Sequence, residues 1–120
     1  MPDMEAALSR FESQVEKSMH RWFRNASMIS ERRYNFIKIR IHINAITFID
    51  VYHNAGNKRG SYALIRQGKR IFGYDNVKAW HRHPLGDSEK HEPCIKPRLS
   101  KVLGEMKRIV ESLPAGEENV

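Results

Sequence analysis

NFIKIRIHI, residues 35–43, decides the fold, because apolar and polar side chains alternate along it from Ile37 onward. Successive side chains of a strand point to opposite faces, so this period of two predicts a strand with one buried and one wet face. The buried row is Ile37, Ile39, Ile41 and Ile43, and the wet row is Lys38, Arg40 and His42. A half-buried strand of this kind is typical of an antiparallel sheet that is covered on one face only.

Three more strands are expected after this stretch. They cover residues 46–53 (ITFIDVYH), 61–66 (SYALIR) and 69–74 (KRIFGY), which are rich in residues that favour strands. The segment 54–60 has the composition of a loop, and Gln67-Gly68 that of a hairpin turn. Gly73, inside the last strand, indicates a bulge or a close approach of another backbone. Short connections between consecutive strands predict an antiparallel meander.

Near both ends of the chain an apolar side chain recurs every three or four residues, which predicts two helices. The first has an apolar stripe from Met4 to Trp22, which Phe23 could extend, with Asp3 as its N-cap, and the second begins at Pro97. We therefore predict one α+β domain, residues 1–120, in which a four-stranded antiparallel meander carries the N-terminal and C-terminal helices on one face. Residues 115–120 are expected to form a flexible tail.

The amino-acid composition limits the kinds of partner and the cellular compartment that we expect. There are 21 Lys plus Arg against 14 Asp plus Glu, a formal charge of +7, which favours a polyanion and above all nucleic acid. Cys94 is the only cysteine, so no internal disulfide can form, and this suits a reducing cytoplasm. No apolar run approaches the ~20 residues of a membrane span, and the first residues do not resemble a signal peptide. We therefore expect a cytoplasmic protein with no membrane partner.

Residues 75–97 form a long connection without a regular pattern, and loops of that length tend to be functional. The segment holds H-x-H at His81 and His83, then H-x-x-C at His91 and Cys94. Imidazole titrates near neutral pH, so the three histidines could take and return protons in one reaction. With a cation on the phosphate, one group would deprotonate a ribose 2′-hydroxyl and another would protonate the leaving 5′-oxygen. This chemistry, without a metal, is the preferred prediction for His81, His83 and His91.

Two other interpretations of the segment stay open. Imidazole and thiolate are zinc ligands, and His81, His83, His91 and Cys94 make the four of a closed tetrahedral site. Their spacing differs from the common zinc pairs, so zinc is the alternative, in a non-enzymatic basic module whose loop is stapled by the metal. The third interpretation is a solvated basic loop with Cys94 as a small buried residue.

Basic and aromatic side chains accompany the histidines. Cations hold the backbone of RNA while unpaired bases stack on aromatic rings. The residues expected to contact a substrate are Lys38, Arg40, Tyr62, Arg66, Tyr74, Asp75 and Arg82, with Trp80 as a further ring. The simpler interpretation of the charged row is the wet face of a sheet, and that of each aromatic is core packing.

The segment SYALIRQGKRIFGYDNVKAWHRHP, residues 61–84, resembles the TumE-like toxins of prokaryotic type II toxin–antitoxin modules. The residues that carry the resemblance are Tyr62, Phe72, Tyr74, Asp75, Asn76, His81, His83, Pro84 and His91. The strand pair IKIRIHINAITFIDVY, residues 37–52, also fits, so the similarity covers roughly residues 36–94.

The resemblance implies a distant relation to the RelE/ParE toxins, in which helices pack on an antiparallel sheet. It implies a growth-arresting toxin that a cognate antitoxin protein holds in check. RelE-like relatives cleave messenger RNA and ParE-like relatives attack gyrase, so the resemblance supports a toxin better than it supports a ribonuclease. Together with the loop histidines it leaves RNA or the ribosome as the expected target, and a metal-independent endoribonuclease as an activity that stays open. A homodimer is a further arrangement that we allow for.

Overall fold

The computed structural model describes residues 3–114. The predicted flexible tail, residues 115–120, lies outside this range. In chain order the elements are α1 (Met4–Trp22), β1 (Ser27–Arg32), β2 (Phe36–Asn44), β3 (Thr47–Asn54), β4 (Gly60–Arg66), β5 (Lys69–Asp75), β6 (His81–His83), β7 (Glu92–Pro93) and α2 (Leu99–Ser112). Neither described helix combines the length and the apolar character that crossing a bilayer requires.

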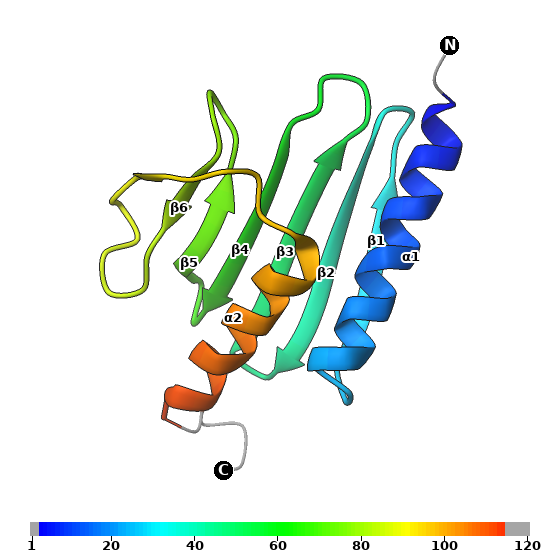
Figure 1. The fold of residues 1–120 in the computed structure, drawn as a ribbon. Coiled ribbons are helices and arrows are strands. Elements are labelled where there is room, and N and C mark those ends of the chain that lie inside the picture. Colours follow the sequence, from blue (N-terminus) through cyan, green and yellow to red (C-terminus); the bar gives the residue numbers. More distant parts are fainter. Residues whose placement is uncertain (1–2, 115–120) are drawn as a thin grey trace.

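The strands form one antiparallel sheet in which each pairs with its neighbour in the sequence, from β1 to β7. Figure 1 shows β1 to β6 side by side in this order. The α+β class and the meander are as predicted, but the sheet has seven strands where four were expected. β1 escaped prediction because only Met28 is even partly buried in it, so it lacks an alternating pattern. β6 and β7 lie inside residues 75–97 and are three and two residues long, too short for any periodicity.

Both helices pack on the face of the sheet formed by the buried isoleucine row (Figure 1). Leu8 of α1, Leu103 of α2 and Ile37 of β2 have no exposed surface. Each such side chain contributes about 1.5–3 kcal/mol of burial free energy. The indole N–H of Trp22 donates to Ser100 Oγ at 3.1 Å and ties the two helices together. The face that carries the helices is therefore the hydrophobic core.

The other face of the central strands is open. Lys38, Arg40 and His42 on β2 are exposed there, as the alternation predicted. Arg40 donates from Nε and Nη2 to the Asp50 carboxylate on β3, at 2.9 and 3.1 Å. This open face continues across β4 and β5 to β6, where two of the histidines lie.

Candidate functional site

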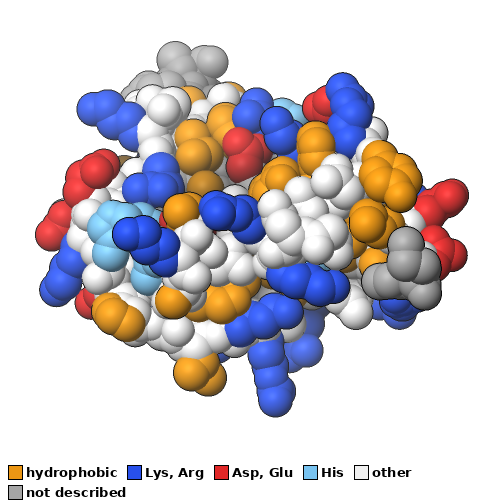
Figure 2. All heavy atoms as spheres, turned by 90° about the horizontal axis from the view of Figure 1, so that it is seen from above, with side chains coloured by type: hydrophobic (Ala, Val, Ile, Leu, Met, Phe, Trp, Pro, Cys, Tyr) orange, Lys and Arg blue, Asp and Glu red, His pale blue; other side chains and the backbone are white. Residues whose placement is uncertain are grey.

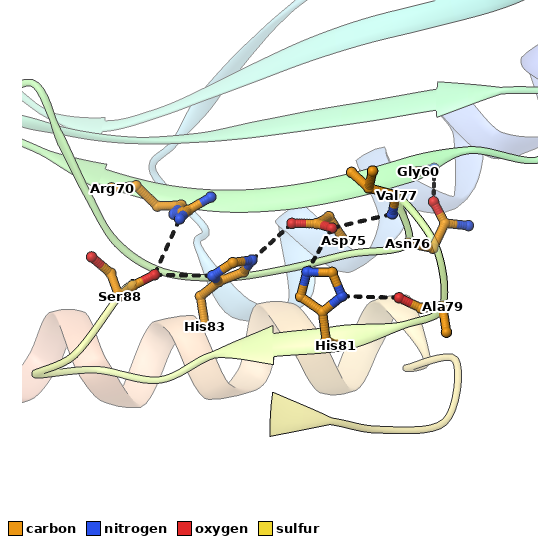
Figure 3. Close-up of polar contacts among 9 residues, drawn as sticks. All are labelled: Gly60, Arg70, Asp75, Asn76, Val77, Ala79, His81, His83 and Ser88. Carbon is orange, nitrogen blue, oxygen red and sulfur yellow. Dashed lines mark hydrogen bonds and ion pairs between the residues drawn. The ribbon is translucent and has the colours of Figure 1, made fainter. Parts of the chain in front are cut away.

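Asp75, at the end of β5, holds two histidines of β6 on the open face of the sheet (Figure 3). In the strand register Asp75 pairs with His81, and Gly73 pairs with His83. His81 Nε2 lies 2.9 Å from Asp75 Oδ1, and His83 Nε2 lies 2.8 Å from Oδ2. The single carboxylate therefore bridges two imidazoles, because residues i and i+2 of a strand share a face.

The second ring nitrogen of each histidine meets a backbone carbonyl. His81 Nδ1 lies 2.9 Å from the Ala79 oxygen, and His83 Nδ1 lies 2.9 Å from the Ser88 oxygen. A carbonyl can only accept, so Nδ1 of each ring is the atom that donates to it, and Nε2 is the atom directed at the Asp75 carboxylate. His83 is almost fully enclosed at 2% exposure. These contacts fix the orientation of both rings.

The carboxylate is held in its charged form. Burial alone would raise the pKa of Asp75. Hydrogen bonds from His83 and from the backbone N–H of Val77, together with the charge of the histidines, outweigh burial and hold the pKa of Asp75 below its usual value. Asp75 thus supplies a negative charge to the histidine pair at neutral pH.

His91 completes the cluster but is placed differently. Its ring centroid lies 4.6 Å from that of His81 and 4.6 Å from that of His83. It is exposed, and no hydrogen bond joins it to any residue between 3 and 114. The three histidines line a cavity of about 620 Å³. His91 is therefore the imidazole most free to exchange a proton with a bound molecule.

Arg70 supplies a cation to the same cavity. Its Nη2 donates to the Ser88 oxygen at 3.1 Å, while its buried Nε has no partner within the described residues. Simple alternation would place Arg70 with Phe72 in the core. The register shifts between Leu64 and Ile65, so that Arg70 pairs with Ile65 and joins the open face. Gly73 allowed for a bulge in this strand but did not place it beside Arg70, and Arg70 was missed for that reason.

Gly73 and Asn76 support the backbone on either side of Asp75. A Cβ on Gly73 would come 2.4 Å from the Tyr62 carbonyl oxygen, so only glycine allows the close approach that the sequence indicated. Asn76 accepts from the Gly60 N–H at 2.8 Å and donates to the Lys58 oxygen at 2.9 Å. It therefore fixes the loop before β6 to the loop before β4 (Figure 3). The two neighbouring residues therefore have different roles: Asp75 orients the histidines, and Asn76 holds the two loops together.

Cys94 does not join the histidines. Among the described residues the group able to share a metal consists of His81, His83 and His91, whose ligand atoms lie within 4.8 Å of one another. The Cys94 N–H donates to the Trp80 oxygen, and its side chain packs against the core on the helix side. Burial raises the pKa of its thiol, which disfavours the thiolate that zinc needs.

The predicted substrate residues are divided between the two faces of the sheet. Lys38, Arg40 and Asp75 lie on the open face. The others lie on the helix face: Tyr62, Arg66, Tyr74 and Arg82.

The side chains on the helix face already contact the core, α2 or the residues after it. Burial raises the pKa of Tyr62 to about 12, and burial with a hydrogen bond to Glu105 raises that of Tyr74 to about 12. Arg82 bridges Glu92 at 3.0 Å and Glu105 at 3.4 Å. Tyr74 and Arg82 join β5 and β6 to α2, Tyr62 lies in the core, and Arg66 donates to the Pro114 oxygen, so the cluster includes none of them.

The family model described as Toxin TumE matches residues 11–113. No curated protein and no solved structure matches.

Proposed function

The chain belongs to the TumE toxin family, and from that premise we propose that it is the toxin of a toxin–antitoxin module that arrests growth by cleaving RNA. The observation that carries the proposal is a pair of imidazoles on one carboxylate, with a third imidazole packed against the pair and Arg70 lining the same open cavity. Acid–base groups and a phosphate-binding cation are what strand cleavage at a ribose requires. A cognate antitoxin protein is the expected partner, and a RelE/ParE-like relationship of the fold remains part of the proposal.

In the proposed reaction His91 takes the proton of a ribose 2′-hydroxyl. The 2′-oxygen then attacks the adjacent phosphorus, and the bond from phosphorus to the 5′-oxygen breaks. His81, whose side chain is 16% exposed, returns a proton from Nε2 to the leaving oxygen. Asp75 positions His81 and His83, and Arg70 faces the negative charge that develops on the phosphate. The products are a cyclic phosphate and a free 5′-hydroxyl, so no other reactant is needed.

The test is His91→Ala, because His91 is exposed and its removal leaves the core intact. General acid–base catalysis contributes roughly 10²–10⁴-fold, so RNA cleavage by purified protein should fall by at least ~100-fold. Growth arrest on induced expression should be relieved, and the wild-type rate should show a bell-shaped pH profile. His20→Ala, at an exposed histidine of α1, is the matched control and should change neither. A folded His91→Ala protein that cleaves and arrests growth like the wild type refutes the proposal.

The second candidate is a metal-stapled binding module, which the closeness of the three histidines favours. A zinc ion would be held by His81, His83 and His91, with Asp75 rather than Cys94 beside it. When bound, the ion would order the segment that it closes. It would also have to displace the contacts of His81 and His83 with Asp75. Elemental analysis of untagged protein decides: stoichiometric zinc supports the module, and cleavage that survives a chelator supports proton transfer.

A further inference from the structure

A second cleft lies at the end of the molecule where the β3–β4 and β5–β6 loops meet the first turn of α2. It has a volume of about 510 Å³ and is bordered by the N-terminal half of α1. Four exposed cations line it: Arg10, Lys58, Lys96 and Arg98. The lining contains no aspartate or glutamate, and none of the four cations forms an ion pair within residues 3–114. Unpaired like charges around one hollow are costly unless an anion compensates them.

The positive potential reaches the floor of the cleft. Burial lowers the pKa of His53, and the charges of Lys96 and Lys58 lower it further. The α2 helix begins here with Arg98 as an N-cap that makes no side-chain hydrogen bond, and its first turn holds no acidic residue. The free N–H groups of that turn add partial positive charge. Figure 2 looks down on this end and shows Lys and Arg side chains across it, with Asp and Glu mainly at the margins.

Trp80 connects this cleft with the histidine cavity. Its ring stacks on Tyr62, with centroids 6.2 Å apart and planes 21° apart, and lies against Gly60, where a Cβ would be 3.4 Å from the indole. Trp80 lines both hollows, because it precedes His81 at the tip of the sheet. An aromatic ring between a row of cations and a reactive cluster is the arrangement that single-stranded nucleic acid uses for base stacking.

We propose that this cleft is the docking site for single-stranded RNA, whose phosphates contact Lys58, Lys96 and their neighbours while a base stacks at Trp80. The strand then continues to the histidine cavity, so the inference rests on the proposed function and adds the path of the substrate. An acidic antitoxin segment would also satisfy the cations. The shared Trp80 favours RNA, because a blocking peptide needs no ring that leads into the cluster.

The test measures binding of a fluorescein-labelled 2′-O-methyl oligouridine, which lacks the hydroxyl that cleavage needs, to the full chain. Lys58→Gln with Lys96→Gln removes two phosphate contacts. Each contact contributes about −0.7 to the log–log salt slope, so the slope should become shallower by about 1.4 and affinity should fall roughly tenfold at low salt. The control is Lys17→Gln with Lys69→Gln, which removes the same charge at exposed lysines outside the cleft and should keep the slope.

The chain has two tryptophans, so Trp22→Phe leaves Trp80 as the sole indole reporter. Addition of the oligonucleotide should quench its emission if a base stacks there. Equal losses in the cleft pair and the control pair, or an unquenched Trp80, overturn the inference. So does unchanged RNA affinity combined with loss of antitoxin binding in the cleft pair. Binding through the cleft without cleavage of unmodified RNA would instead defeat the proposed chemistry and leave the docking site standing.

Discussion

Asp75→Asn tests whether the carboxylate organises the cluster. Asp75 accepts from His81 at 2.9 Å, from His83 at 2.8 Å and from the Val77 N–H at 3.2 Å, with its side chain 16% exposed. Asparagine keeps one oxygen and turns an amide donor toward the other imidazole, so one charge-assisted contact is lost. Such a contact is worth about 1.5–3 kcal/mol, and we expect the free energy of unfolding to fall by about 2 kcal/mol.

Asp50→Asn is the matched control on the same face of the sheet. Its pair with Arg40 is half exposed, with side chains 43% and 47% accessible, so solvent screening limits the loss to about 0–1 kcal/mol. Urea titrations of both variants and the wild type should show a shifted midpoint with an unchanged slope. If Asp75→Asn is no more destabilising than Asp50→Asn, the carboxylate does not organise the cluster.

The pH dependence of the same titrations gives a second check. The folded pKa of Asp75 is lowered, so its stabilisation is fully present above the ordinary aspartate pKa of about 3.9. That stabilisation is lost as the pH falls through the folded value. The gap between wild type and Asp75→Asn should therefore be present at pH 5–6 and shrink below about pH 4. A gap that widens in acid contradicts the assigned direction of the pKa shift.

Two further substitutions, in β5 next to Asp75, test the strand packing and the helix contact that support the site. Gly73→Ala would place a Cβ 2.4 Å from the Tyr62 carbonyl oxygen, so β4 and β5 must shift and thermal denaturation should show a loss of about 1–3 kcal/mol; an unchanged melting temperature contradicts this contact. Tyr74→Phe removes the hydroxyl that donates to Glu105 on the helix face, so stability should fall by about 1 kcal/mol while RNA affinity stays unchanged; a tenfold loss of affinity would return Tyr74 to the substrate surface.

The sequence predicts the centre of this fold because its central strands have one wet and one buried face. In β2 the residues that alternate in sequence also alternate in burial, so the period of two is visible. β1 is an edge strand exposed along nearly its whole length, and β6 is three residues long, so neither leaves such a trace. β1 and β6 pair with their neighbours in the meander, and β6 is also held by the contacts of its histidines with Asp75. These interactions exist only in the assembled sheet.

The sequence predicts which residues belong to the candidate site better than it predicts the face of the sheet on which each one lies. His81 and His83 are two residues apart in a strand and therefore share a face. Cys94 lies three residues beyond His91, and an odd separation in an extended segment places two side chains on opposite faces. The same rule assigns Arg70 to the core until the bulge in the β4–β5 register moves it to the cavity. The face on which a side chain lies depends on how its strand pairs with the next one, and the sequence of one strand does not show that pairing.

The number of free ring nitrogens bears on the chemistry of the cluster. His81 and His83 each have both nitrogens against an oxygen atom, whereas His91 has none engaged within the described residues. A metal would need nitrogen lone pairs from all three rings, so two rings would have to exchange carboxylate contacts for the ion. Proton transfer disturbs fewer contacts, because His91 can accept a proton directly and only His81 gives up its contact with Asp75 when it donates from Nε2. The existing contacts therefore suit an orienting carboxylate, one positioned donor and one free base.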